Sequence, residues 1–323
     1  MKLKDSIKVF ADNDISLKKN FLDNVSKSNY RNKLRDFFDN YLRRCFYEVL
    51  YKGFFKKQKY KIDLILPAKG FSDEARKNKL NEFYKIKDKD ILIIGCGNGK
   101  DILNLLKFRP KSIKGIDMLN YSQSWSRIKK YLKNKNIKTK ISFQKIDILH
   151  LQDNLKFDFI ISDAVFEHLV KFKKVIKFLT NILKKNGMIY ASYGPLWYCY
   201  AGDHFSGRDK FQNGYNHLIL NKKNYKNYFE KNVGTIVYEI NRQGSAGILV
   251  KEGLFSKLNS NEYMKIYNEN NLVSLFTVLE YCPIGFKLLR SNKILQKKIL
   301  KKNTSINLED LYLKSHIVYL KKK

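Results

Sequence analysis

Three glycines at alternate positions form the most distinctive short motif of the chain. Gly95, Gly97 and Gly99 lie in "DILIIGCGNGKDILNLL", between an apolar run and an amphipathic segment. A strand that ends in such a loop and leads into a helix presents bare backbone N–H groups to a ligand, and glycine lets the ligand approach where a Cβ would collide. The spacing is GxGxG, which differs from the GxGxxG of dinucleotide-binding loops. The motif therefore predicts a ligand site of another kind.

Acidic residues and histidines follow the later apolar runs. Asp117 ends "GID", Asp147 ends "FQKID", and Asp163 ends "IISD". Histidine is the side chain whose ordinary pKa suits proton transfer near neutral pH. Five are present: His150, His168, His204, His217 and His316. His168 lies just beyond Asp163, and His204 lies in "AGDHF", so these two are the candidates for chemistry, with Glu167 and Asp203 as sequence neighbours that could orient them.

The elements that must position these residues alternate between strands and helices from residue 90 onward. Short runs such as "ILIIG", "SIKGID" and "FDFIISD" are apolar on both faces, and helical segments separate them. This order predicts an α/β fold with a doubly wound parallel sheet. One helix has an apolar stripe at helical spacing, formed by Phe172, Val175, Ile176, Leu179, Ile182 and Leu183.

The regions before and after this alternating core differ from it in their predicted secondary structure. Helical spacing over 30–51 and a helix after the N-cap Ser72 predict a helical N-terminal extension over 1–86. After Gly194 comes an aromatic stretch without apolar periodicity, and long loops of this type are usually functional. We then expect a helix at 220–232, a strand at 234–240, a helical insertion over 241–314 that forms a lid, and the last strand at 315–323.

The ordered set of motifs resembles the class I S-adenosylmethionine-dependent methyltransferases, in particular their small-molecule branch (type 11, or ubiquinone-methyltransferase-like). The resemblance covers about 87–240 and implies that this range is the cofactor-binding core, with a Rossmann-like doubly wound sheet and S-adenosyl-L-methionine as the cofactor. The segment "LKKNGMIYAS" corresponds to the fifth-strand pattern, usually LKPGG, with Asn186 in place of the first glycine.

The resemblance also implies a role for each motif residue. Gly95, Gly97 and Gly99 would wrap the methionine part of the cofactor. Asp117, with Met118 beside it, would take both ribose hydroxyls, which two carboxylate oxygens do better than a neutral side chain. Asp147 would accept the adenine amino group with Ile148 against the ring, and Asp163 is the acid that the family often has after the fourth strand.

The absence of certain motifs reduces the number of possible classes of methyl acceptor. There is no (Asp/Asn)-Pro-Pro-aromatic motif of base-directed enzymes, and Cys199 follows the fifth strand, whereas a pyrimidine-attacking cysteine lies near the fourth. Asp163 has no evident second and third acidic partner for Mg²⁺, so we predict no metal. A hydroxyl acceptor benefits from a general base, for which we propose His168 or His204.

The aromatic loop points to the same class of acceptor. Trp197, Tyr198 and Tyr200 could stack on a flat or sugar-like molecule, or could simply cover the edge of the sheet. The segment also resembles "GPL(W/Y)YS…GxH" in methyltransferases of bacterial glycan clusters. We therefore expect O-methylation of a small molecule or a saccharide hydroxyl.

Composition leaves two alternatives open. The net charge is +34, which suits a nucleic-acid partner, but lysines are spread evenly along a Lys-, Ile- and Asn-rich chain, so a nucleic acid is possible and not favoured. An RNA methyltransferase and a non-catalytic methyltransferase-like scaffold remain the alternatives. No run approaches the roughly 18 apolar residues of a membrane span, so we expect no transmembrane segment and a cytoplasmic protein; the oligomeric state stays open.

Overall fold

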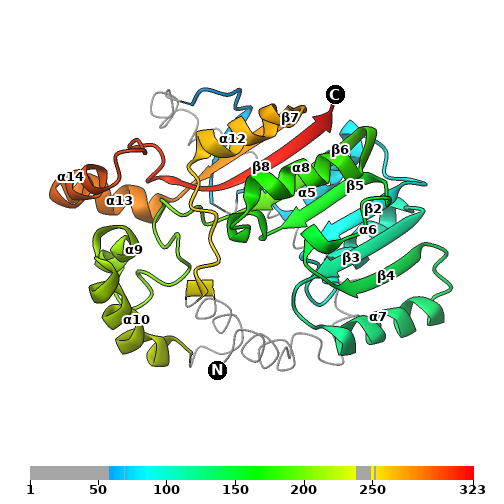
Figure 1. The fold of residues 1–323 in the computed structure, drawn as a ribbon, viewed down its shortest axis with the longest axis horizontal. Helices are drawn as coiled ribbons and strands as arrows, with labels where there is room; N and C mark the ends of the chain where they lie inside the picture. Colours follow the sequence, from blue (N-terminus) through cyan, green and yellow to red (C-terminus); the bar gives the residue numbers. More distant parts are fainter. Residues whose placement is uncertain (1–57, 69, 238–248, 251) are drawn as a thin grey trace.

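The computed structural model describes residues 58–323 except 69, 238–248 and 251. Its strands form one sheet in the order β1-β7-β8-β6-β5-β2-β3-β4 (Figure 1). β8 is antiparallel to its neighbours β6 and β7, whereas the other pairs are parallel. The strands are β1 (Leu64–Pro67), β2 (Asp90–Ile94), β3 (Ser112–Asp117), β4 (Lys140–Lys145), β5 (Phe157–Asp163), β6 (Leu183–Tyr193), β7 (Leu272–Tyr281) and β8 (Leu313–Lys322). The predicted α/β class is confirmed.

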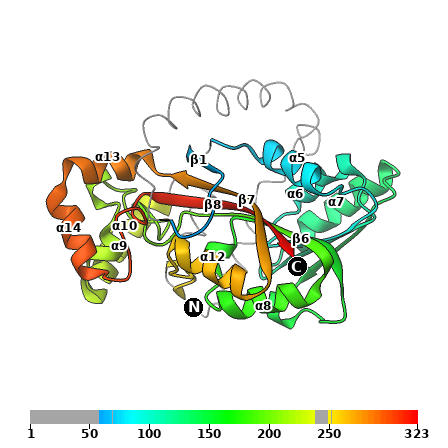
Figure 2. The ribbon, with the colours of Figure 1, turned by 90° about the horizontal axis from the view of Figure 1, so that it is seen from above.

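Side chains alternate between two hydrophobic cores, one on each face of the sheet. In β2, Ile91 and Ile93 belong to one core, and Leu92 and Ile94 belong to the other. Helices cover both faces, as Figure 2 shows. The first face carries α5 (Asp73–Phe83), α6 (Lys100–Leu105) and α7 (Ser122–Asn134), and the second carries α8 (Phe172–Ile182) and α12 (Ser260–Glu269). The sheet is therefore doubly wound, as predicted.

The predicted apolar stripe forms the buried side of α8. Phe172, Val175, Ile176, Leu179 and Ile182 are each at most 3% exposed. Burying one such side chain contributes about 1.5–3 kcal/mol, so the stripe fixes this helix to the sheet. The sixth predicted member, Leu183, is also buried, but it begins β6.

The remaining helices lie beyond one end of the sheet, on the left of Figure 1. They are α9 (Asn216–Ile219), α10 (Lys222–Val237), α13 (Pro283–Ser291) and α14 (Lys293–Lys302), and short 3-10 helices occur at η3 (Leu106–Phe108), η4 (Ile148–His150), η5 (Phe166–His168) and η6 (Phe211–Asn213). None of the helices in the described ranges is both long and apolar enough to cross a membrane.

Two strands were missed by the sequence prediction. Residues 234–237, predicted to begin a strand, belong to α10, and the rest of that segment lies outside the described residues. The strand that pairs with β8 is instead β7, inside the predicted helical insertion 241–314, and β1 lies inside the predicted helical extension. The middle and end of β7 are buried from Thr277 to Tyr281 without alternation, so this strand lacks the period-two pattern of a half-exposed strand. The predicted helix at 30–51 lies outside the described residues, and the division into domains stays a prediction.

A buried ion pair joins α5 to the end of β5. Ser72 caps the helix as predicted, because its Oγ accepts a hydrogen bond from Ala75 N at 3.1 Å. Lys77 is 0% exposed, and its Nζ contacts carboxylate oxygens of Asp163 and of Asp73, the latter at 3.0 Å. Burial opposes a charge on Lys77, but the two carboxylates outweigh it and hold the pKa of Lys77 above its usual value. Tyr190 completes the network, because its hydroxyl donates to Asp163 at 2.8 Å.

We expect Lys77→Met to lower the free energy of unfolding by about 3–5 kcal/mol, because Asp163 would keep a buried charge without its main partner. Urea unfolding followed by circular dichroism measures this change. The matched control is Lys79→Met in the same helix, which removes a 3.0 Å surface pair with Glu82 and should cost less than about 1 kcal/mol. Equal losses in the two variants would contradict a structural role for the buried pair.

Candidate cofactor and acceptor site

The glycine loop lies at the point where the strand order of the sheet reverses. β2 is flanked by β3 on one side and β5 on the other, and ligands of open α/β sheets bind beyond the carboxyl ends of the strands at such a point. Gly97 has φ +50°, and a Cβ there would meet no atom within 4 Å. The backbone of Gly97 therefore faces open space, as a loop that receives a ligand must.

Gly95 has the opposite surroundings. A Cβ at this position would lie 2.1 Å from Val165 Cγ2, which is far inside van der Waals contact. Val165 belongs to the turn after β5, and the preceding Ala164 has φ +56°, a conformation that non-glycine residues rarely adopt. The two loops thus pack directly on each other, so the residues that follow Val165 lie beside the glycine loop.

Asp117, at the end of β3, hydrogen-bonds to the glycine loop. Its Oδ2 accepts from Gly97 N at 2.8 Å, and its Oδ1 accepts from Leu119 N at 2.8 Å. Burial raises the pKa of Asp117, and these backbone donors act in the opposite direction. Each carboxylate oxygen keeps a further lone pair, so the carboxylate is fixed in orientation and can still accept from two hydroxyls. Met118 beside it is 50% exposed and offers an apolar surface.

Trp125 supports the same loop and was not singled out from the sequence. Its Nε1 donates to Gly97 O at 2.8 Å, and its ring stacks on Phe143, with centroids 5.4 Å apart and planes inclined by 6°. No sequence motif marks Trp125 as a partner of the glycine loop. The contact depends on how α7, which carries Trp125, packs against the sheet.

The other predicted cofactor residues lie in different settings. Asp147 caps η4, since its Oδ1 accepts from Leu149 N at 2.9 Å, and the adjacent Ile146 N donates to Asp117 O at 2.8 Å. Asp147 is therefore next to Asp117. Ile148 is 5% exposed and belongs to the hydrophobic core, whereas Asp163 is paired with Lys77. The structure brings the glycines, Asp117 and Asp147 together. In contrast, the side chain of Ile148 packs in the hydrophobic core, and the carboxylate of Asp163 pairs with Lys77.

These residues fit an adenosyl cofactor. The open backbone at Gly97 leaves room for close approach, the carboxylate of Asp117 is oriented with acceptor capacity to spare, and Met118 lies exposed beside it. Two adjacent hydroxyls and a flat ring system are what such a set can bind.

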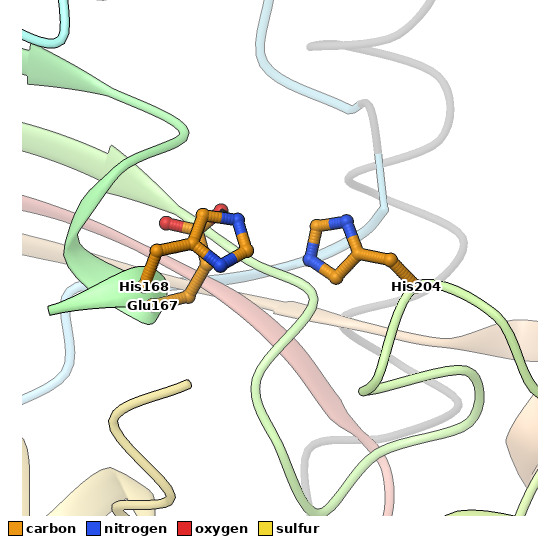
Figure 3. Close-up of side chains that lie close together, drawn as sticks. All are labelled: Glu167, His168 and His204. Carbon is orange, nitrogen blue, oxygen red and sulfur yellow. Dashed lines mark ion pairs between the residues drawn. The ribbon is translucent and has the colours of Figure 1, made fainter. Parts of the chain in front are cut away.

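The two predicted catalytic histidines meet beside this region. His168 comes from η5 and His204 from the loop after β6, and Figure 3 shows their rings turned toward each other. The ring centroids are 4.8 Å apart. Glu167 Oε1 lies 3.9 Å from His168 Nε2. Burial lowers the pKa of His168 to about 4 and, together with His168, that of His204 to about 3, while burial raises the pKa of Glu167 to about 8.

A short segment of the predicted lid covers this cluster. His168 Nδ1 is 2.9 Å from Leu254 O, so Nδ1 carries the proton and Nε2 is left with the lone pair. Ser256 N donates to Glu167 O at 2.9 Å. The ring of Phe255, which is 4% exposed, lies 5.5 Å from His168, 5.8 Å from His204 and 5.0 Å from Trp197. Phe255 was missed by the sequence prediction because no local pattern connects it to the histidines.

The loop that carries His204 is held by Asp203. The Oδ1 of Asp203 accepts from Phe205 N and Ser206 N, and its Oδ2 accepts from Ser206 Oγ at 2.7 Å and Tyr225 Oη at 2.5 Å. The sequence suggested that Asp203 could orient the imidazole of His204. The carboxylate of Asp203 instead accepts hydrogen bonds from the loop backbone, Ser206 and Tyr225. Tyr200 is also part of the loop's own packing, because its hydroxyl donates to Phe211 O at 3.1 Å.

We expect Asp203→Asn to lower the free energy of unfolding by about 2–4 kcal/mol, because several hydrogen bonds to a buried carboxylate are weakened at once. The comparison is Asp209→Asn in the same loop, where two side-chain bonds, from Tyr228 and Asn213, are affected at a more exposed site, and where we expect about 1 kcal/mol. Urea unfolding measures both. A larger loss for Asp209→Asn would show that Asp203 does not anchor the loop.

Cofactor binding gives a direct measure of Asp117. We expect Asp117→Asn to weaken the binding of S-adenosylmethionine by about 1–3 kcal/mol, or roughly tenfold to 150-fold, because charge-assisted bonds are lost. Isothermal titration calorimetry measures the affinity, and the exposed Asp153→Asn is the control. Unchanged affinity in Asp117→Asn would remove this residue from the cofactor site.

Comparisons with known proteins find several that are similar to this chain. The chain is 30% identical over 138 residues to the tRNA U34 carboxymethyltransferase of Campylobacter fetus, covering 42% of this chain and 47% of that protein. It is 33% identical over 111 residues to an uncharacterized protein of Rickettsia prowazekii, covering 33% and 43%. The chain thus spans about half the length of these curated relatives. A solved S-adenosylmethionine-dependent methyltransferase from Mesorhizobium loti has a TM-score of 0.43 and 11% identity, over 76% of this chain and 96% of the other.

The match to a family is more extensive. The sequence model of the family described as a methyltransferase domain matches residues 85–271, which is more than half of the chain and contains the glycine loop, Asp117 and both histidines. The chain therefore belongs to the methyltransferase domain family, within the class I enzymes whose cofactor is S-adenosylmethionine.

Proposed function

We propose that this class I methyltransferase methylates a hydroxyl oxygen of a saccharide or another small polar molecule. The observation that carries the proposal is the pair His168 and His204 beside the glycine loop, with the Nε2 atom of His204 buried and without a hydrogen-bond partner. A buried acceptor atom without a partner is costly, and it is satisfied when a hydroxyl group donates to it.

The cofactor, when bound, supplies a methyl group on a positively charged sulfur, which needs no further activation. The chain must then hold the cofactor, align the acceptor and take the hydroxyl proton. We assign cofactor binding to Gly95, Gly97, Gly99, Asp117, Met118 and Asp147, with Ile148 and Asp163 supporting them from the core and from the Lys77 ion pair.

Proton transfer falls to the histidine pair. Burial keeps both imidazoles neutral at neutral pH, so each has one nitrogen that can accept a proton. The bond to Leu254 O leaves Nε2 of His168 as that nitrogen. The proposal therefore keeps the role of proton acceptor that the sequence predicted for His168 or His204.

The walls around the histidines support a small acceptor. Phe255 and Trp197 pack beside the pair, and the side chain of His168 is 17% exposed. Aromatic rings suit the apolar faces of a sugar ring, and the partial exposure of His168 leaves its side chain accessible to a hydroxyl group.

A second candidate is methylation of RNA. It is favoured by the relatives named tRNA U34 carboxymethyltransferases, one of which is 30% identical over 138 residues, and by the net charge of +34. This candidate predicts binding to RNA that weakens steeply with salt, because lysines would release counterions from phosphates.

The deciding experiment follows the methyl group. Purified protein is incubated with S-adenosylmethionine labelled in its methyl group and with a cell lysate divided into small-molecule, glycan and RNA fractions. We expect label in the small-molecule or glycan fraction, and we expect His204→Asn to lower the rate about 100-fold or more while cofactor affinity stays within about threefold. Asparagine tolerates the φ of +62° at this position, so the loop is preserved.

The other outcomes separate the candidates. Label confined to RNA would replace the proposed acceptor with the second candidate. Label in glycans at an undiminished rate in His204→Asn would keep the acceptor and remove His204 from the reaction. The exposed His150→Asn serves as the matched control and should change neither rate nor affinity.

A further inference from the structure

Three potential metal ligands converge in the cluster of Glu167, His168 and His204. One ligand atom from each residue lies within 4.8 Å of the other two (Figure 3). Glu167 Oε2 and His204 Nε2 are buried and have no hydrogen-bond partner. Each unsatisfied buried polar group of this kind costs about 1–3 kcal/mol, so two of them in one small cluster require an explanation.

Two of these three side chains are also fixed by hydrogen bonds to the backbone. His168 Nδ1 donates to Leu254 O at 2.9 Å, and Glu167 Oε1 accepts from Gly194 N at 3.0 Å. Histidines that bind metals almost always donate their other nitrogen to a carbonyl or a carboxylate, which fixes the tautomer and the direction of the free lone pair. His204 is held differently, by a backbone with φ +62° and a bond from its N to Ala201 O at 2.9 Å.

We propose that Glu167, His168 and His204 bind one divalent transition-metal ion, of which Zn²⁺ fits the ligands best. Two imidazoles and one carboxylate are a common catalytic zinc set, in which three protein ligands leave a fourth position open. Mg²⁺ and Ca²⁺ prefer oxygen ligands and are excluded by the nitrogen atoms.

The spacing is compatible with coordination after a small contraction. A cation at the centre of three atoms 4.8 Å apart lies about 2.8 Å from each, whereas zinc bonds to nitrogen and oxygen are about 2.0–2.2 Å long. Each ligand atom must therefore move inward by roughly 0.7 Å to reach the bond length of a zinc site.

This site differs from the metal site that the sequence analysis considered and rejected. The rejected site would have used acidic partners of Asp163, whose carboxylate is paired with Lys77. The ligands proposed here come from the turn after β5 and from the loop after β6, and only their packing brings them together.

The metal would change how the acceptor is handled, a consequence that rests on the proposed function. An acceptor hydroxyl in the open position would have its pKa lowered by the cation and would lose its proton to water. The imidazole lone pairs would then bind the ion and would not take the proton. The ligand role and the base role are therefore alternatives that experiment can separate.

The test measures metal binding directly, with neither cofactor nor acceptor present. The full chain, without a histidine tag, is stripped with a chelator, freed of the chelator, and titrated with ZnCl₂ in a calorimeter. We expect one Zn²⁺ per chain. CoCl₂ in the same site should give the visible absorption bands of a four- or five-coordinate ion.

Three variants and a control locate the ion. Glu167→Gln keeps an acceptor for Gly194 N, His168→Asn keeps a donor for Leu254 O, and His204→Asn keeps the positive φ, so each removes a ligand with little change to the fold. We expect each to weaken Zn²⁺ binding at least about 100-fold, since even outer-shell partners of metal ligands are worth 10–100-fold. His150→Asn, on the surface, should bind within twofold of the unmodified chain.

The results separate this proposal from the proposed function. The absence of stoichiometric Zn²⁺ binding, or binding that survives all three variants, would overturn the metal site, and full methyl transfer by chelator-treated protein would then assign the histidines to proton transfer. Zn²⁺ binding that depends on the three residues supports the site even where no hydroxyl compound is labelled, in which case only the proposed acceptor fails.

Discussion

The contact between Gly95 and Val165 is the constraint on which the rest of the site depends. A Cβ on Gly95 would lie 2.1 Å from Val165 Cγ2, so glycine alone allows the turn after β5 to lie against the loop after β2. That turn reaches Val165 through Ala164 at φ +56°, a strained conformation that neighbouring contacts must maintain. Because the turn continues directly into Glu167 and His168, this one close approach fixes the position of these two residues relative to the glycine loop.

The opposite side of the site is built by different means. His204 lies on an irregular loop, and the buried carboxylate of Asp203 gathers hydrogen bonds from that loop and from Tyr225 of α10. Leu254 and Phe255 then close over the two imidazoles from a segment far away in the sequence. The sheet positions the glycine loop and Asp117, whereas loop packing positions His204 and Phe255. This division agrees with the usual placement of variable function on loops around a constant scaffold.

The buried charged and polar groups differ in how well their charges and hydrogen bonds are satisfied. Lys77 is buried, but two carboxylates compensate its charge, as folded proteins require of buried ions. Glu167 is also buried, with His168 and His204 partly buried beside it, yet Glu167 Oε2 and His204 Nε2 are enclosed and have no hydrogen-bond partner. Native proteins satisfy nearly all buried polar groups, and exceptions tend to occur where function requires them. This contrast is the reason why we propose that the cluster, and not the Lys77 ion pair, handles a hydroxyl, a proton or a metal ion.

The sequence alone determined the features that depend on neighbours along the chain. The GxGxG spacing, the acid at the end of β3, the cap at Ser72 and the stripe of α8 are local patterns with a direct structural meaning, and they were sufficient for the fold class and the cofactor. Only the tertiary structure decided that β7 is a strand, because a strand buried on both faces loses the alternation that identifies it. It also decided that Asp163 pairs with Lys77 and that Glu167, His168, His204 and Phe255 form one cluster. Such contacts join segments distant in sequence, and their energy depends on the packing of the whole sheet, which no local pattern encodes.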